Sequence, residues 1–254
     1  MIELSKVSLH RGGEAILEGA FVCIEASQVV LISGPSGIGK TSLLSLIGGF
    51  LTADEGSVRV FNHDVARMRS TSTALLRRRL AFVPQELELI GDMSALANVR
   101  LALEVCGTGR REAKRRASEA LDAVDLADVK KRKVSELSTG QRRRVSLARG
   151  LVRNAQIFVA DEPSNDLDAE RVLQLVELIE DMREAGTAVV IATNDPRFLA
   201  HAQQPGWRHL ALSCSQLIPG DMTSLFSNPP SKRILEEFSS ADNVVPFPVS
   251  ARGE

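Results

Sequence analysis

The chain has 254 residues, a formal net charge of -1, 44% hydrophobic residues and 25% charged residues. This length and balance are typical of a folded globular chain and exclude a fibrous, disordered or membrane-embedded protein as the main class. Aromatic residues make up only 4% of the chain, which argues against the stacking platforms of single-stranded nucleic-acid binders. A near-neutral charge also gives no global attraction for nucleic acid, so we expect no nucleic-acid partner.

The cysteines and the N-terminal segment bear on the compartment. Cys23, Cys106 and Cys214 are an odd, widely spaced set, which fits a reducing compartment better than a disulfide framework. Residues 1–4 lack the basic and apolar regions of a signal peptide, and the apolar runs are far shorter than the roughly 20 residues of a membrane span. We expect a cytoplasmic protein that is peripheral on the inner membrane only through a partner.

The first forty residues indicate β-structure that leads into a glycine-rich loop. Short apolar segments alternate over residues 2–32 around a turn-like stretch at 11–14, and 29–33 is predicted to be a buried strand. From Lys40 onward, apolar residues recur at helical spacing as far as Gly48. The order is therefore strand, glycine-rich loop, helix.

The rest of the chain alternates helices with buried strands. The predicted elements are charged helices over 94–135, a helix after Gly140, a strand at 157–160, an amphipathic helix over 168–184 and a strand at 187–193. Alternating helices and apolar strands predict an α/β fold with a parallel, doubly wound sheet.

A phosphate-binding motif occupies the glycine-rich loop. Glycines let backbone N–H groups curl around a β-phosphate, Lys40 reaches the β- and γ-phosphate oxygens, and Thr41 offers a hydroxyl to Mg²⁺. The positive dipole end of the following helix adds to this attraction for anions. We assign the nucleotide contacts here to the residues that match the pattern G-x-x-x-x-G-K-S/T and to the next serine: Gly34, Pro35, Ser36, Gly37, Ile38, Gly39, Lys40, Thr41 and Ser42.

Two acidic residues at the end of the 157–160 strand supply the remaining chemistry. Neighbouring side chains at a strand end point to different sides, so one carboxylate can bind Mg²⁺ while the other polarises a water molecule. We assign Asp161 to the metal and Glu162 to the role of general base. Together with the phosphate-binding loop, this pair predicts hydrolysis of a nucleoside triphosphate, with ATP and Mg²⁺ as cofactors.

Three further segments carry a family resemblance. Residues 137–141 read LSTGQ and resemble the ABC signature LSGGQ, 82–85 read FVPQ and resemble the Q-loop, and 166–168 resemble the D-loop. The chain therefore resembles the ATPases of the ABC family over roughly residues 1–217. Residues 85–94 and the Asn-Val pair at 98–99 look most like the subgroup that contains FtsE, LolD and MacB.

The resemblance implies a domain plan. It is a P-loop NTPase (RecA-like) core with an N-terminal antiparallel β subdomain and an inserted α-helical subdomain. We place the ABC ATPase domain at 1–220, with the core at 1–86 and 152–220 and the helical subdomain at 87–151. Residues 221–254 are expected to be a partly disordered C-terminal extension, because an Asn-Pro-Pro sequence breaks the chain at 228–230.

The resemblance also implies partners. Two such chains form a head-to-tail homodimer or heterodimer, in which the site built by Lys40, Gln85 and Glu162 is completed by the second chain. Gln85 is also expected at the metal. The residues that the second chain would contribute are Ser138, Gly140 and Gln141. An integral membrane permease, similar to FtsX or LolC, is the expected third component.

Several residues depart from the family pattern. Asn194 stands where these ATPases usually have a histidine, and an amide can donate a hydrogen bond to a γ-phosphate but cannot carry charge. The usual adenine-stacking aromatic is missing, so we expect His10 or Arg11 to stack there. Thr139 replaces a signature glycine, and Ser-Gln at 27–28 replaces Gly-Glu. We expect slow hydrolysis.

Alternatives remain at two points. An ATP-dependent dimerising scaffold or switch with vestigial hydrolysis, related to cell division or the cell envelope, competes with a subunit that drives a permease. The apolar residues after the Q-loop could form an exposed docking patch for the permease or could pack the helical subdomain. These residues are Leu87, Leu89, Ile90 and Met93.

Overall fold

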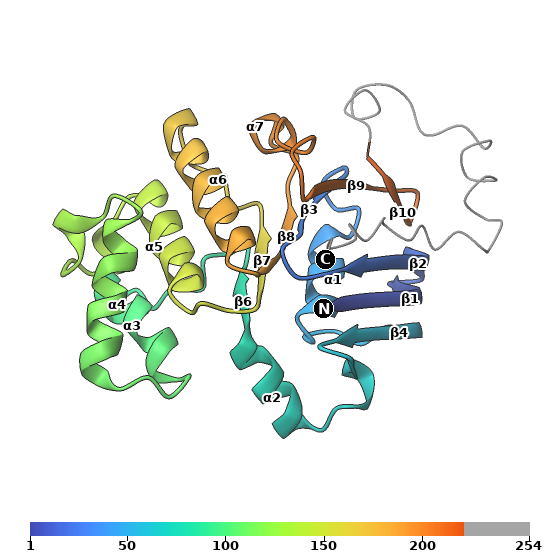
Figure 1. Cartoon of the computed structure of the whole chain (residues 1–254), viewed down its shortest axis with the longest axis horizontal. Coiled ribbons are helices and arrows are strands. Elements are labelled where there is room, and N and C mark those ends of the chain that lie inside the picture. Colours follow the sequence, from blue (N-terminus) through green and yellow to red (C-terminus); the bar gives the residue numbers. More distant parts are fainter. Residues whose placement is uncertain (221–254) are drawn as a thin grey trace, which may run out of the picture.

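The computed structural model describes residues 1–220, and the predicted C-terminal extension lies outside the described residues. Two β-sheets and a group of helices make up this part of the chain (Figure 1). One sheet has four strands in the order β2-β1-β4-β5, and the other has six in the order β10-β9-β3-β8-β7-β6. No helix within residues 1–220 is both long enough and apolar enough to cross a membrane.

The four-stranded sheet is antiparallel and begins with a tight hairpin. A two-residue turn joins its first two strands, and both turn residues, Gly12 and Gly13, have positive φ values of 60° and 85°. Glycine adopts this conformation without steric cost, and such turns match the twist of paired strands. The strands are β1 (Ile2–Arg11), β2 (Glu14–Ile24), β4 (Glu55–Val60) and β5 (His63–Asp64).

The six-stranded sheet is parallel except for its edge strand β10, which pairs antiparallel with β9. All residues of β3, β7 and β8 are buried, which accounts for their continuous apolar sequences. The strands are β3 (Val29–Ser33), β6 (Leu80–Val83), β7 (Ile157–Asp161), β8 (Ala188–Ala192), β9 (Trp207–Ser213) and β10 (Gln216–Pro219).

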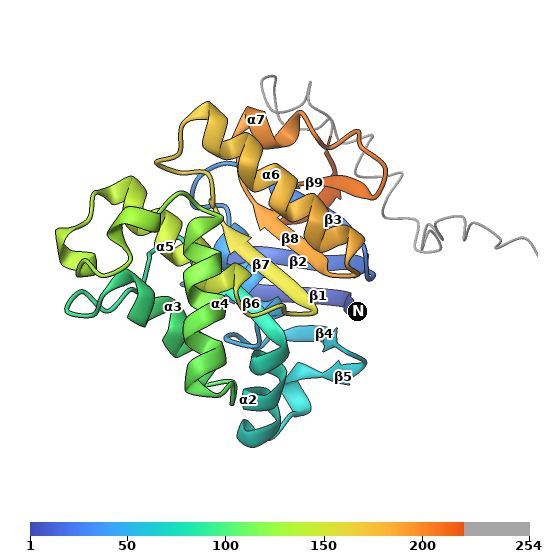
Figure 2. The same ribbon diagram turned by 60° about the vertical axis from the view of Figure 1, so that its left-hand side comes forward.

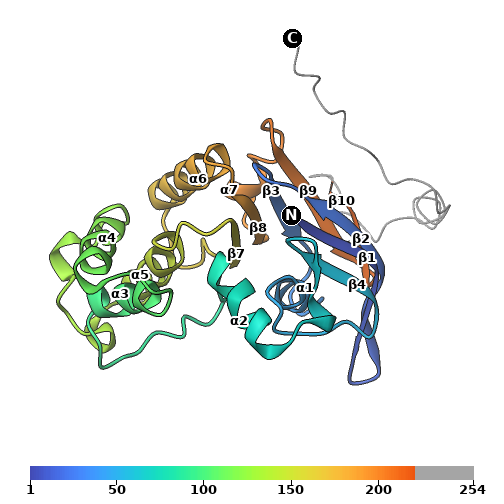
Figure 3. The same cartoon turned by 60° about the horizontal axis from the view of Figure 1, so that its bottom comes forward.

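Helices cover both faces of the parallel sheet. Helix α1 (Lys40–Ile47) lies between the two sheets (Figure 3). On the opposite face, α6 (Ala169–Glu184) runs across β7 and β8 (Figure 2), and α7 (Pro196–Leu199) contacts α6. Asp168 caps the N-terminus of α6 by accepting a hydrogen bond from the Arg171 N–H, which explains where this helix starts.

Three of the remaining helices form a group at one side of the molecule (Figure 1). Helices α3 (Ala95–Glu104), α4 (Arg110–Asp122) and α5 (Thr139–Leu151) pack on one another, whereas α2 (Ser70–Arg79) contacts β6 and leads into it. Three short 3-10 turns occupy Val65–Arg67, Ala127–Val129 and Val134–Glu136. The basic residues of α4 lie mainly on its exposed face, as the charge pattern predicts.

Three separate hydrophobic clusters follow this layout. Alternate residues of β3 serve different clusters: Val30 and Ile32 pack with α1 and the antiparallel sheet, while Val29 and Leu31 pack with α6 and α7. A third cluster belongs to α3, α4 and α5. The α/β fold class expected from the sequence is therefore confirmed, while the domain boundaries stay a prediction.

Candidate functional site

Four predicted functional segments meet at one edge of the parallel sheet. The carboxyl ends of parallel strands lie at the same edge, and ligands of α/β proteins bind there. The glycine-rich loop follows β3, Gln85 follows β6, Glu162 follows β7 and Asn194 follows β8. An open depression of about 610 Å³ lies there, lined by Ser36, Gln85, Glu162, Asn165, Asn194, Asp195, Pro196 and Arg197.

The loop between β3 and α1 has a backbone shape that requires glycine at two positions. Gly34 has a φ of 150°, and a Cβ atom there would lie 2.5 Å from the carbonyl oxygen of Leu212. Gly39 has a φ of 114°, and a Cβ atom there would overlap the side chain of Ile16. The chain therefore passes from the end of β3 into α1 by a close turn that only glycine permits.

Lys40 lies inside this loop, and its ammonium group bridges the loop to Glu162. Its Nζ donates hydrogen bonds to the carbonyl oxygens of Gly34 (2.7 Å) and Pro35 (3.3 Å), and lies 3.8 Å from Glu162 Oε1. Only 8% of Lys40 is exposed. A buried ammonium group close to the N-terminus of α1 makes this loop a strong anion site.

Thr41 and Asp161 form the predicted metal pair. The Thr41 hydroxyl donates a 2.5 Å hydrogen bond to Asp161 Oδ2, and Asp161 is 1% exposed. Burial raises the pKa of the Asp161 carboxyl, although the hydrogen bond from Thr41 and the charges of Lys40 and Arg143 oppose this. A hydroxyl and a carboxylate are oxygen ligands of the kind that Mg²⁺ prefers, so these residues fit the expected ion.

Glu162 has an unusual backbone for a non-glycine residue. Its φ is 46°, and its N–H donates to the carbonyl oxygen of Ala192 at 2.8 Å. A left-handed conformation of this kind costs free energy and persists only where surrounding contacts hold it. It directs the carboxylate into the depression, toward Lys40, while the Asp161 carboxylate points toward Thr41. The two acidic neighbours thus face different partners, as the strand-end argument predicts.

The signature segment forms a capped helix start. The Ser138 hydroxyl accepts a hydrogen bond from the Gln141 N–H, and the Gln141 side chain accepts one from the Ser138 N–H. Gly140 lies close to the D-loop, because a Cβ atom there would be 3.1 Å from the Asp166 carbonyl oxygen. Among residues 1–220, the lining of the depression includes none of Ser138, Gly140 and Gln141.

The predicted adenine contacts lie in the hairpin of β1 and β2, close to a further residue that reaches the loop. Arg11 and His10 are exposed at the end of β1, and the His10 N–H donates to Asp54. From the same hairpin, Ile16 packs against Gly39. Ile16 is an apolar residue in an ordinary strand pattern, and its sequence therefore carries no signal for a place beside the loop.

A second unexpected site residue is Arg143. It is 5% exposed on α5, and its Nε and Nη1 atoms are buried with no hydrogen-bond partner among the described residues. Burial lowers the pKa of this guanidinium, against the charges of Asp166, Asp161 and Glu162. Arg143 therefore places a positive charge close to the carboxylates of Asp161 and Glu162. Its spacing of four from the buried Leu147 could have indicated an inward-facing position.

A third unexpected contact lies just before the loop. The side chains of Ser33 and His209 are buried, and Ser33 Oγ lies 2.7 Å from His209 Nε2. Ser33 is the last residue of β3 and His209 lies opposite Leu31 on β9. The hydrogen bond fixes the end of β3 immediately before Gly34.

These features define the class of protein. A parallel sheet whose first buried strand runs into a glycine-rich loop, a buried lysine and a helix, with an acidic pair after a neighbouring strand, is a P-loop NTPase fold. The chain belongs to the ABC transporter family, because the model for "ABC transporter" matches residues 17–165.

Named relatives cover most of this chain but only part of their own length. The macrolide export ATP-binding/permease protein MacB of Neisseria meningitidis is 37% identical over 209 residues, which cover 80% of this chain and 32% of MacB. An uncharacterized ABC transporter ATP-binding protein of Mycobacterium tuberculosis is 33% identical over 216 residues, which cover 84% of this chain and 64% of that protein. The chain thus spans about a third of the MacB relatives that it matches.

Solved structures agree with this assignment. The ATP-binding cassette MJ0796, in a dimeric post-hydrolysis state bound to ADP and Pi, superimposes with a TM-score of 0.78 at 30% identity, covering 85% of this chain and 96% of that chain. An ATP-binding subunit of another ABC transporter gives a TM-score of 0.77 at 19% identity and supports the fold alone.

Proposed function

We propose that this chain binds ATP with Mg²⁺ and hydrolyses it slowly, and that binding and hydrolysis in a head-to-tail dimer act on a membrane permease. The observation that carries the proposal is the arrangement of Lys40, Thr41, Asp161 and Glu162 around one loop. Lys40 would neutralise the β- and γ-phosphates, and Thr41 with Asp161 would hold Mg²⁺. Glu162 would accept the proton of the attacking water.

Mg²⁺ would add charge neutralisation between the phosphates. Within the described residues, no group of three or more His, Cys, Asp or Glu side chains could hold a metal ion alone. Sites of one or two protein oxygen ligands completed by substrate phosphates are common for Mg²⁺. Gln85, which lines the depression after β6, is the further residue that we assign to the metal and the attacking water.

The position of the signature segment supports dimerisation. Ser138 and the N-terminus of α5 offer a hydroxyl and a positive dipole end to an anion, and they lie outside the depression beside Lys40. A second chain, identical or different, would bring its own Ser138, Gly140 and Gln141 to this depression. The dimeric state of MJ0796 supports the proposal.

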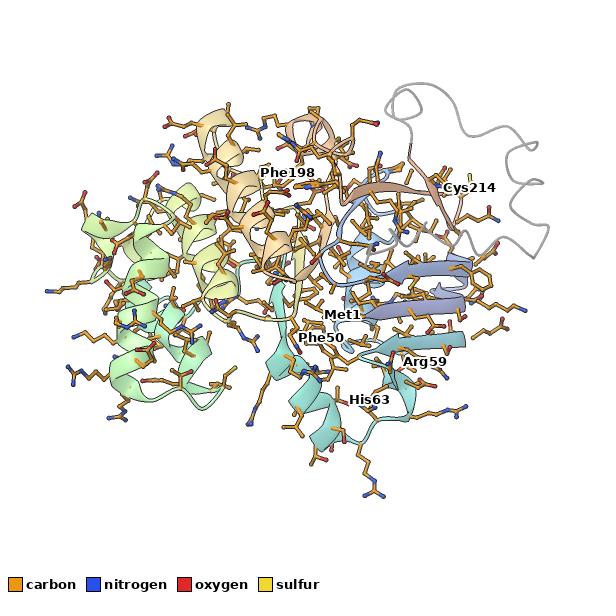
Figure 4. The ribbon with its side chains drawn as sticks, viewed as in Figure 1. Met1, Phe50, Arg59, His63, Phe198 and Cys214 are labelled. Carbon is orange, nitrogen blue, oxygen red and sulfur yellow. The ribbon has the colours of Figure 1, made fainter. Side chains whose placement is uncertain are left out.

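A groove between the two halves of the cassette is the site that we propose for the permease. It has a volume of about 240 Å³ and is lined mainly by Phe50, Arg77, Phe82, Pro84, Glu88, Ala102, Arg149 and Arg153. Phe50, labelled in Figure 4, is 48% exposed. Its ring makes an edge-to-face contact with Phe82, with the ring centroids 5.2 Å apart. Large exposed aromatic residues in a hollow are typical of a protein interface.

The sequence left open whether the apolar residues after the Q-loop dock the permease or pack the helical subdomain, and they differ in exposure. Leu89 packs against the helical cluster, whereas Ile90 is 45% exposed. Arg149 holds the segment by donating to the carbonyl oxygens of Leu87 and Glu88. The partial burial of Leu89 supports a packing role, and we propose the groove beside the apolar run as the docking surface.

The name of MacB, an ATP-binding/permease protein, supports a permease partner for this chain. Expression in a membrane setting tests it: the full chain should co-purify with an integral membrane protein, and Phe50→Glu should lower that yield while basal ATP hydrolysis stays unchanged. Leu173→Glu is the matched control, because Leu173 is 55% exposed on α6, away from the groove. Equal yields for both variants would contradict the docking site.

A direct test of the nucleotide site uses Glu162→Gln. This variant keeps the size and hydrogen bonding of the side chain but removes the base, so hydrolysis should fall about 10²- to 10⁴-fold. ATP binding should persist, and the closed dimer should accumulate in size-exclusion chromatography with ATP and Mg²⁺. Turnover equal to that of the parent would show that Glu162 is not the base.

The alternative function is an ATP-dependent dimerising switch in which hydrolysis is vestigial. The amide of Asn194 favours slow turnover, because it pairs with the backbone of Gly34 and lacks the charge of an imidazolium. Turnover in the presence of the reconstituted permease separates the two functions. A permease that raises the rate supports a driving subunit, and an unchanged slow rate supports the switch.

A further inference from the structure

The side-chain amide of Asn194 meets both polar groups of one peptide residue in the phosphate-binding loop. The Gly34 N–H donates to Asn194 Oδ1 at 3.0 Å, and Asn194 Nδ2 donates to the Gly34 carbonyl oxygen at 2.8 Å. The two residues are 160 positions apart in the chain. The pair forms a ring of two hydrogen bonds, like the hydrogen-bonded residue pairs of antiparallel strands.

The backbone hydrogen bonds between β3 and β8 position this amide. Ile32 pairs with Ala192 in the parallel register, and the Thr193 N–H donates to the Ile32 carbonyl oxygen at 2.9 Å. The next N–H after β3, that of Gly34, donates to the Asn194 side chain and not to a backbone carbonyl oxygen of the neighbouring chain segment. On its other side, the Asp195 N–H donates to the Thr193 hydroxyl at 3.0 Å. The backbone on both sides of Asn194 is thus held while its side chain reaches Gly34.

Gly34 depends on such a partner. Its φ of 150° and the nearby Leu212 carbonyl oxygen restrict this position to glycine, which has the largest conformational freedom to lose. Its carbonyl oxygen accepts from Lys40 Nζ as well as from Asn194. When Lys40 turns its donors toward a phosphate, Asn194 would still hold the Gly34 peptide.

We propose that Asn194 is a positioning residue for the phosphate-binding loop, which fixes Gly34 and so acts on ADP and ATP alike. This inference rests on the proposed nucleotide site. A contact to the γ-phosphate, by contrast, would act on ATP only. A histidine could not reproduce the pairing, because the two ring nitrogens point in diverging directions, whereas the amide oxygen and nitrogen point the same way.

The test compares ADP and ATP affinities of the full chain and of Asn194→Ala, by isothermal titration calorimetry. Loss of two backbone hydrogen bonds should weaken both nucleotides by about the same factor, roughly tenfold. Gln204→Ala is the matched control, because Gln204 carries the same amide group, is exposed in the turn before β9 and does not line the depression, so we expect unchanged affinity for ADP. Weaker ATP binding with unchanged ADP binding would assign Asn194 to the γ-phosphate and overturn the proposal.

A second measurement does not depend on nucleotide binding. Amide hydrogen exchange of Gly34, followed by NMR without nucleotide, should become faster in Asn194→Ala. It should stay slow in Asn194→Asp, which keeps the acceptor for the Gly34 N–H. Unchanged exchange in Asn194→Ala would overturn the proposal even if the chain bound no nucleotide. A parent that exchanges Gly34 slowly but binds neither ADP nor ATP would instead refute the proposed function.

Discussion

Two loops of this molecule are held in the same way, one at the edge of the parallel sheet and one in the helical group. At the edge of the parallel sheet, Asn194 pairs with the N–H and carbonyl oxygen of Gly34. In the helical group, Asn98 accepts from the Ile90 N–H at 2.8 Å and donates to the Ile90 carbonyl oxygen at 3.0 Å. In each case, one asparagine side-chain amide hydrogen-bonds to both the N–H and the carbonyl oxygen of a single residue.

The surroundings of the two pairs differ. Asn98 is 3% exposed and its partner lies only eight positions away, whereas Asn194 is exposed and holds a residue 160 positions away. Asn98 also donates to the Ser94 carbonyl oxygen at 3.1 Å, so it fixes the start of α3 together with the loop. We therefore expect the same pairing to contribute mainly to folding at the buried Asn98 and, as proposed, to nucleotide binding at Asn194.

Replacing Lys40 should produce the largest effect on the site. Lys40→Ala removes the ammonium group that donates to Gly34 and Pro35, and we expect nucleotide affinity to fall about 10- to 100-fold, because hydrogen bonds to charged groups contribute about 1.5–3 kcal/mol. Calorimetric titration with ATP measures the loss. The free energy of unfolding, from urea titration, should change much less, because the site is at an open edge. Equal ATP affinity would remove Lys40 from the phosphate contacts.

Replacing Asn98 should lower the free energy of unfolding and leave nucleotide affinity unchanged. Asn98→Ala removes the acceptor of the Ile90 N–H and one of the two donors to each of the Ile90 and Ser94 carbonyl oxygens, which keep the Met93 N–H and the Asn98 N–H. The free energy of unfolding should therefore fall by about 1–3 kcal/mol. Urea titration of parent and variant measures this change, and ADP affinity is the control that should not move. A variant that loses ADP affinity but no stability would erase the difference between the two asparagines.

Asp161 gives the smallest expected effect on stability, and this effect depends on pH. Burial raises the pKa of its carboxyl in the folded chain, so the folded state binds more protons than the unfolded state between the ordinary value and the raised one. Stability due to this group is therefore highest at low pH and falls as pH rises through that window.

Asp161→Asn removes this titration and keeps an oxygen that can accept the Thr41 hydrogen bond. Without Mg²⁺, the variant should gain stability relative to the parent as pH rises from about 4 toward neutrality, because the unfolded carboxyl titrates near 3.9. Thermal unfolding at several pH values measures the difference. If the difference in stability between parent and variant stays constant across this range, the pKa of Asp161 does not change on folding. Mg²⁺-dependent hydrolysis should be lost in the same variant.

The sequence by itself determined the elements and the contiguous motifs. The apolar runs at 29–33, 157–160 and 187–193 became buried parallel strands, and the helix from Lys40 ends before Gly48 as expected. These predictions succeed because strand burial, glycine turns and helix caps depend on residues close together in the chain. The phosphate-binding loop is recognisable for the same reason, since its glycines and Lys40 follow one another.

Only the tertiary structure decided which distant residues meet. The register of β3 against β8 brings Asn194 to Gly34, and the hairpin of β1 and β2 carries Ile16 onto Gly39. The sequence left Leu89 open between docking and packing, and the packing of α3, α4 and α5 turned it inward. These contacts join residues far apart in the chain, so no local pattern encodes them. They follow from strand register and helix packing, which depend on the whole core.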